Sequence, residues 1–169
     1  PFIYYGDEIG MRYVEGLKSV EGGYNRTGSR SPMQWDDSTN AGFSSAPASD
    51  LYIAMDPDKD RPTAKKEMAA PDSLYHEVKK LIRIRQSHKA LQSRGKITFV
   101  YAEKNAYPLA YIREDGDEKI LVIINAAAEA KTFACDAEPK EAIYNFGAAA
   151  EAKNGKITVP AQSAGFYRI

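Results

Sequence analysis

The sequence predicts an α+β fold in two parts: a mixed region over residues 1–92 and an antiparallel β-sandwich of Greek-key type over residues 93–169. Three observations predict it. The chain opens with a short apolar and aromatic run, one segment near residue 80 has the period of an amphipathic helix, and the hydrophobic period changes to two after Gly95. The 169 residues are enough to bury a core.

Composition argues against several function classes. The chain has 23 Lys and Arg against 23 Asp and Glu, so it lacks the basic excess expected of a nucleic-acid binder or a polybasic membrane anchor. The longest apolar run, residues 120–124, falls far short of the roughly 18 residues that suggest a membrane span. We therefore expect neither nucleic acid nor membrane as a partner. The single cysteine, Cys135, allows no internal disulfide, and we expect its thiol to be buried in a strand.

The opening run, residues 1–6, is continuous, apolar and aromatic, and it ends in glycine. This pattern is typical of a strand buried on both faces in a parallel sheet, which needs neighbouring strands and covering helices. The residues that follow show no βαβ partner. We interpret the chain as the C-terminal piece of a larger α/β enzyme; the alternative is an edge strand of a small mixed sheet.

Residues 12–71 are rich in Gly, Ser, Asp, Asn and Pro and have no sustained helical or strand period. Connections without secondary structure rarely exceed about 12–15 residues in compact domains unless they are functional loops. We expect an elaborated loop after the opening strand, of the kind that surrounds active sites.

A helix is expected over residues 72–88. Pro71 and Asp72 supply a start signal and an N-cap, and basic residues gather in the C-terminal half, where they complement the helix dipole. One apolar stripe is formed by Leu74, Val78, Leu81 and Ile82.

Beyond Gly95, short alternating segments are separated by turn signals such as Asp115-Gly116 and Asn154-Gly155. Their regular spacing is typical of an antiparallel sandwich. The candidate strands are residues 96–102, 109–113, 119–125, 131–135, 141–145, 156–159 and 165–168.

No complete catalytic apparatus or metal site is visible. The acidic residues from Asp56 to Glu67 follow the spacing of a calcium loop, but Arg61 stands where that loop needs glycine, so a solvated acidic loop is the better interpretation. Adjacent pairs such as Asp7-Glu8 point to opposite sides of an extended chain and cannot flank one glycosidic bond.

Asp36 and Asp37 are likewise adjacent and cannot flank one bond. His76 and His88 are expected at the surface. The sequence therefore assigns no catalytic residue, no metal ligand and no cofactor.

Two motifs resemble the α-amylase family of glycoside hydrolases, family thirteen. Residues 1–11, PFIYYGDEIGM, resemble the family's eighth-strand segment. Residues 30–36, RSPMQWD, followed by NAGF at 40–43, resemble a block that marks the α-glucosidase, oligo-1,6-glucosidase and trehalose synthase branch. Residues 72–91 resemble the last helix of the family's barrel.

The resemblance implies that residues 1–92 supply the eighth strand, an active-site loop and the last helix of a (β/α)8 barrel, and that residues 93–169 are the C-terminal all-β domain. The parent enzyme would be a retaining α-glucosidase or α-amylase type acting on oligosaccharides or α-glucans. The family's three catalytic acids lie on earlier barrel strands, so none maps onto this chain. The isolated chain should be inactive, and its uncovered strand would favour homo-oligomers.

The resemblance gives one residue a substrate-binding role. Arg30 occupies the position whose guanidinium reaches the terminal glucose in this branch, and a guanidinium presents a fork of donors that suits sugar hydroxyls. Gln34 and Trp35 are expected to pack the loop, and Asp7 and Glu8 to be structural.

A different class of function stays open: residues 93–169 could be a non-catalytic sandwich that binds carbohydrate, or one that only covers and stabilises the barrel. A binding sandwich would expose at least three coplanar aromatic rings. The available tyrosines are Tyr101, Tyr107, Tyr111, Tyr144 and Tyr167.

Overall fold

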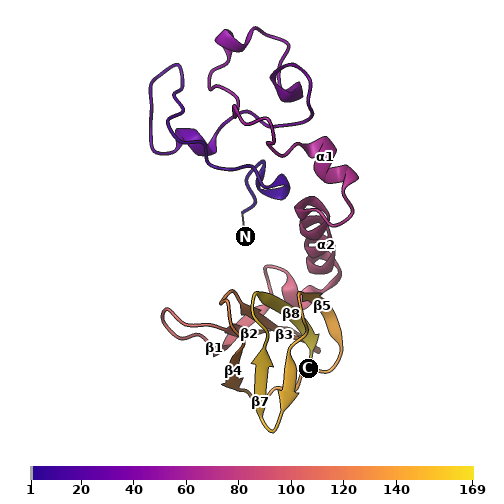
Figure 1. The fold of residues 1–169 in the computed structure, drawn as a ribbon. Coiled ribbons are helices and arrows are strands. Elements are labelled where there is room, and N and C mark those ends of the chain that lie inside the picture. Colours follow the sequence, from indigo (N-terminus) through magenta and orange to yellow (C-terminus); the bar gives the residue numbers. More distant parts are fainter. Residues whose placement is uncertain (1) are drawn as a thin grey trace. The chain divides into compact units, whose positions relative to one another are not determined.

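The computed structural model describes residues 2–169; the first residue of the expected opening strand, Pro1, lies outside the described residues. The chain divides into two compact units, Pro1–Leu81 and Ile82–Ile169. Loops and short helical turns dominate the first unit, and two antiparallel sheets form the second (Figure 1).

The expected strand at the start of the chain is wrong for its described residues. Residues 2–6 form no strand, and Phe2 is 104% exposed. The Tyr4 N–H instead donates to Asp7 Oδ2 at 2.8 Å, closing a local turn. A parallel strand depends on hydrogen bonds from its neighbours, and none of residues 2–169 pairs with this segment.

The long loop that follows is present, with short helical turns inserted in it. These are the 3₁₀ turns Asp7–Ile9, Thr27–Ser29, Thr39–Gly42 and Ala48–Asp50, and the α-helix α1, Ala64–Ala69. The sequence analysis missed α1 because six residues are too few to show a hydrophobic period. Thr63 caps α1, accepting a hydrogen bond from the Lys66 N–H at 3.2 Å.

An ion pair between the half-exposed Arg12 and the buried Asp56 connects the beginning of this loop to its later part. The Arg12 guanidinium donates to both oxygens of Asp56, at 2.8 and 2.9 Å, and the Asp56 side chain is 2% exposed. Burial raises the pKa of Asp56, but the hydrogen bonds from Arg12 and from the Asp58 N–H outweigh it, so the net pKa is lowered. Asp56, the first residue of the calcium loop considered above, is therefore paired with an arginine.

Helix α2, Leu74–Ser87, confirms the expected helix. Its N-terminus is held by Ser73 rather than Asp72: the Ser73 carbonyl accepts from the N–H groups of His76 and Glu77. The apolar stripe is only partly covered, with Leu74 46% exposed and Ile82 40% exposed.

The second unit has eight strands, seven of which lie where the sequence predicted. The missed one is β6, only three residues long. Their bounds are β1 Lys96–Tyr101, β2 Leu109–Asp115, β3 Glu118–Asn125, β4 Lys131–Ala134, β5 Ala142–Phe146, β6 Glu151–Lys153, β7 Lys156–Val159 and β8 Ser163–Arg168.

These strands form two antiparallel sheets, with the orders β1-β2-β3-β8-β5 and β4-β7-β6. Asn154 and Gly155 both have positive φ, 53° and 70°, as a type I′ hairpin between β6 and β7 requires. The loop between β2 and β3 is Gly116-Asp117, one residue later than predicted.

The two sheets share one hydrophobic core, which makes this unit a sandwich. Cys135 is 6% exposed, which confirms the expected buried thiol. Residues from both sheets meet in a cluster of Ala110, Leu121, Ile123, Phe133, Cys135, Ile157, Val159 and Tyr167.

The other face of the larger sheet is partly covered by the 3₁₀ turn Lys89–Leu91, which follows α2. Ala90 and Leu91 pack on Ile120 and Val122. The expectation that His88 is a surface group is wrong: its side chain is 13% exposed and its Nδ1 lies 2.6 Å from Glu118 Oε1.

Candidate functional site

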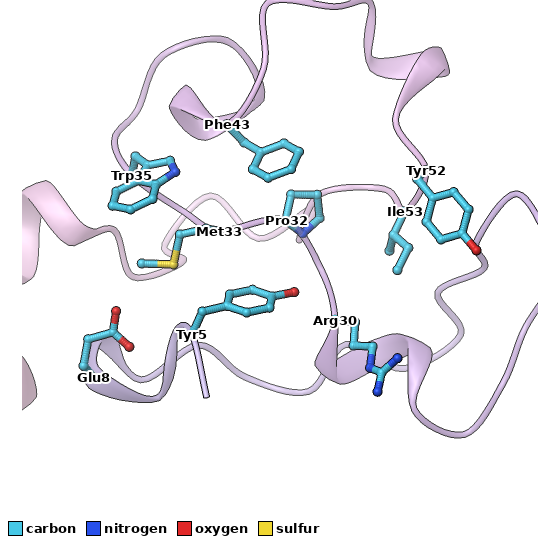
Figure 2. A pocket seen from close by; sticks show the side chains of 9 residues that line it. All are labelled: Tyr5, Glu8, Arg30, Pro32, Met33, Trp35, Phe43, Tyr52 and Ile53. Atoms are coloured by element: carbon cyan, nitrogen blue, oxygen red, sulfur yellow. The ribbon is translucent and has the colours of Figure 1, made fainter. Parts of the chain in front are cut away.

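The motif residues of the first unit border an apolar pocket of ≈ 450 Å³. Most of its walls are aromatic or aliphatic, and two charged side chains stand among them (Figure 2). The lining residues are Tyr5, Glu8, Arg30, Pro32, Met33, Trp35, Phe43, Tyr52 and Ile53.

Arg30 follows the turn Thr27–Ser29, which fixes its backbone. Its N–H donates to the Thr27 carbonyl at 3.0 Å, and the Thr27 hydroxyl accepts from the Tyr24 N–H at 3.1 Å. The side chain of Arg30 is exposed at the edge of the pocket, with its guanidinium directed away from the rings of Trp35 and Phe43 (Figure 2).

The guanidinium of Arg30 has no hydrogen-bond or ion-pair partner within residues 2–169. The simplest structural role, pairing with a carboxylate of its own loop, is therefore not found among the described residues. All five N–H donors of Arg30 are available to a ligand.

The two halves of the second motif are bound to each other. The N–H groups of Trp35 and Asp36 donate to the Ala41 carbonyl, at 2.8 and 3.2 Å. Asn40 adopts the left-handed conformation, φ 50°, and its amide donates to the carbonyls of Ser44 and Ala46. Asparagine suits this position because it tolerates positive φ and can bond to nearby backbone.

This arrangement turns Trp35 and Phe43 toward the pocket, and the two are 52% and 49% exposed. Gln34 is 1% exposed and lies inside the unit, as expected. Trp35 is covered by its own loop over only about half of its surface, and the other half is exposed.

The carboxylates near the pocket are occupied by local turns. Glu8 Oε2 accepts from the Gly6 N–H at 2.9 Å, as Asp7 does from Tyr4. The Ser38 hydroxyl and N–H donate to Asp36 and lower its pKa. The lowered pKa makes Asp36 a poor general acid.

No group of three or more His, Cys, Asp or Glu side chains in residues 2–169 is arranged to hold a metal ion. None of the helices described is long and apolar enough to cross a membrane.

The tyrosines that could have formed a sugar-binding platform do not form one. Only Tyr107 of the five is exposed, at 45%; Tyr144 and Tyr167 are buried in the sandwich, and Tyr101 and Tyr111 are half-buried. These five tyrosines therefore do not supply the three exposed rings that would favour a carbohydrate-binding sandwich.

Comparison with known proteins gives several related matches. The glucan 1,6-alpha-glucosidase of Streptococcus pneumoniae serotype 4 is 29% identical, over 95% of this chain and 34% of its own length. The oligo-1,6-glucosidase of Bacillus cereus is 32% identical, over 79% of this chain and 28% of its own length. The chain thus spans about a third of the length of these relatives.

Solved structures agree with these relatives. The R284C mutant of the trehalulose synthase MutB superposes with a TM-score of 0.79 at 26% identity, covering 99% of this chain and 35% of MutB. The sequence model of the family described as "Alpha amylase, catalytic domain" matches residues 1–94. The resemblance carried by the two N-terminal motifs is confirmed: the chain belongs to the α-amylase family.

Proposed function

We propose that this chain is the C-terminal part of a retaining α-glucosidase-type glycoside hydrolase that acts on the α-glucosidic bonds of oligosaccharides. Residues 1–92 would supply one active-site loop, the last helix of the (β/α)8 barrel and the segment of its eighth strand, which forms no strand within residues 2–169 and would need barrel strands from the longer enzyme as partners. Residues 93–169 would supply the Greek-key C-terminal domain. The end of the family match at residue 94 and the names of the relatives support this division.

Catalysis in this proposal depends on residues outside the chain. Retaining glycosidases use two carboxyl groups about 5–5.5 Å apart, one as nucleophile and one as acid/base. In this chain Glu8, Asp7 and Asp36 are bound to their own turns, and Asp56 is bound to Arg12. The 169-residue chain alone should not hydrolyse glucosides.

Arg30 is the residue to which we assign substrate binding. The observation that carries the assignment is its guanidinium beside the pocket, which has no hydrogen-bond or ion-pair partner among residues 2–169. Two N–H groups of a guanidinium can donate to neighbouring sugar hydroxyls at a fixed spacing. The apolar faces of Trp35 and Phe43 offer adjacent surfaces against which the C–H face of a sugar could pack. The proposed ligand is the terminal glucose of an oligosaccharide.

The test is Arg30→Ala in the longer enzyme that carries this chain, assayed with an α-glucoside substrate. Hydrogen bonds to a charged group are worth about 1.5–3 kcal/mol, so kcat/KM should fall about 10- to 150-fold. Arg94→Ala, at an exposed arginine outside the pocket, is the matched control and should leave kcat/KM unchanged. Equal kcat/KM values for Arg30→Ala and the wild type would rule out the assigned role.

A second assay addresses the chain by itself. Turnover of the same α-glucoside by the purified 169-residue protein would contradict the proposal that its carboxylates are structural.

A further inference from the structure

We infer that Tyr5 is a positioning residue for Arg30: its hydroxyl holds the peptide that follows Ser31, one residue beyond Arg30, and thereby limits where the guanidinium points. The inference rests on the proposed substrate-binding role of Arg30. The Tyr5 hydroxyl donates to the Ser31 carbonyl at 3.0 Å, across 26 residues of sequence. Ser31 is 2% exposed, so this carbonyl has little access to water as a substitute donor.

The backbone two residues before Arg30 is fixed independently. The Gly28 carbonyl accepts from the Val14 N–H at 3.0 Å. A Cβ at Gly28 would lie 2.3 Å from the Val14 carbonyl oxygen and 2.7 Å from the Tyr13 ring, so only glycine allows this approach. The backbone on the N-terminal side of Arg30 is therefore held by packing and does not depend on the Tyr5 hydroxyl.

The C-terminal side depends on Tyr5. The Arg30 guanidinium has no hydrogen-bond or ion-pair partner within residues 2–169, and its charge lies close enough to act on the Tyr5 phenol, so its backbone and rotamer largely determine where it points. The Arg30 N–H, bonded to the Thr27 carbonyl, and the Ser31 carbonyl, bonded to Tyr5, hold the backbone on the two sides of the Arg30–Ser31 peptide. Loss of the Tyr5 hydrogen bond would free the C-terminal side, and the long side chain of Arg30 would magnify the resulting backbone change.

Tyr5 has a second role that can be separated from the first. Its ring lines the pocket, and Figure 2 shows it between Glu8 and Arg30. Tyr5→Phe keeps the ring in the wall and removes only the donor. The effects of this substitution therefore report on the hydrogen bond.

The first experiment measures the hydrogen bond in the 169-residue protein. The ¹³C carbonyl shift of Ser31 should change in Tyr5→Phe, and amide hydrogen exchange at Arg30 should become faster. Tyr107→Phe, at an exposed tyrosine of the sandwich, is the control and should change neither. An unchanged Ser31 shift and Arg30 exchange rate would overturn the inference, whatever Arg30 binds.

The second experiment tests the consequence for substrate in the longer enzyme. Loss of a neutral hydrogen bond should raise KM about 3- to 10-fold, with kcat nearly constant, because Arg30 binds ground and transition states alike. In the Arg30→Ala background, Tyr5→Phe should have no further effect.

Additive losses in the double variant would overturn the inference while leaving the role of Arg30 intact. If Arg30→Ala alone has no effect, the proposed function fails, and the Ser31 carbonyl shift still decides whether Tyr5 holds the loop.

Discussion

Tyr167 joins three parts of the sandwich through one hydroxyl. It donates to Asn145 Oδ1 at 2.7 Å and accepts from the Ala150 N–H at 3.0 Å. Its ring lies over Gly165, where a Cβ would be 2.4 Å from the ring atoms. Strand β8 is thereby connected to β5 and to the loop that follows it.

Tyr167→Phe should lower the free energy of unfolding of the second unit by about 1–3 kcal/mol, since the Asn145 amide oxygen and the Ala150 N–H each lose a buried partner. Urea unfolding followed by far-UV circular dichroism measures the change. Tyr107→Phe, which also removes one hydroxyl, is the control and should unfold at the wild-type urea concentration. Matching midpoints for the two variants would show that the Tyr167 hydroxyl contributes nothing.

At the scale of elements, Glu118 at the start of β3 holds the turn that follows α2. Its Oε1 lies 2.6 Å from His88 Nδ1 and 3.9 Å from the Arg168 guanidinium, and its Oε2 accepts from the Ala90 N–H at 2.8 Å. Burial raises the pKa of Glu118, but the Ala90 N–H and the hydrogen bond and charge of His88 outweigh it, and the net pKa is lowered below its ordinary 4.5.

A carboxyl group whose pKa is lower in the folded than in the unfolded chain stabilises the fold. This stabilisation is complete above the unfolded-state pKa and is lost as the pH falls through the folded-state pKa. Exchange protection at Ala90 should therefore decrease below pH 4.5. In Glu118→Gln this protection should be weaker at neutral pH and nearly independent of pH from about 6 to about 3.

Glu138→Gln, at a carboxylate outside this cluster, provides the control and should keep the wild-type pH dependence at Ala90. If exchange protection at Ala90 changes equally with pH in Glu118→Gln and in the wild type, another group causes the acid sensitivity.

The accuracy of the sequence analysis also differs by element. Helix α2 and seven of the eight strands follow from local periodicity, which adjacent residues determine. The expected strand at residues 2–6 failed because a parallel strand needs partners elsewhere in the chain. His88 was misplaced for a similar reason: its partner, Glu118, lies 30 residues away.

The pocket was accessible to the sequence analysis only in part. Arg30 was identified through its motif, whereas the contact of Tyr5 with Ser31 joins two motifs that no local pattern connects. The outward position of Trp35 was missed because it depends on the turn at Asn40 and Ala41, where both residues have positive φ.

At the scale of the whole molecule, the first unit exposes several large apolar side chains. Phe2, Ile3 and Trp35 are each more than half exposed, Phe43 is nearly so, and Trp35 and Phe43 line the same pocket. Exposed apolar patches mark interaction sites or lead to association.

We therefore expect the purified 169-residue protein to self-associate, as measured by light scattering over a concentration series. Phe2→Ser combined with Phe43→Ser should weaken the association, whereas Lys104→Ser, at an exposed residue of the second unit, should not. A concentration-independent monomer with residues 2–11 protected from hydrogen exchange would contradict the prediction.

The strand order of the larger sheet has a consequence for synthesis on the ribosome. Strand β8 lies between β3 and β5, yet it is translated after every other strand of the sandwich. Until β8 pairs, β3 has an open edge and β5 has no partner in the larger sheet. The sheet therefore closes only when β8 is in place, and a delay in its docking would prolong the exposure of the β3 edge to aggregation.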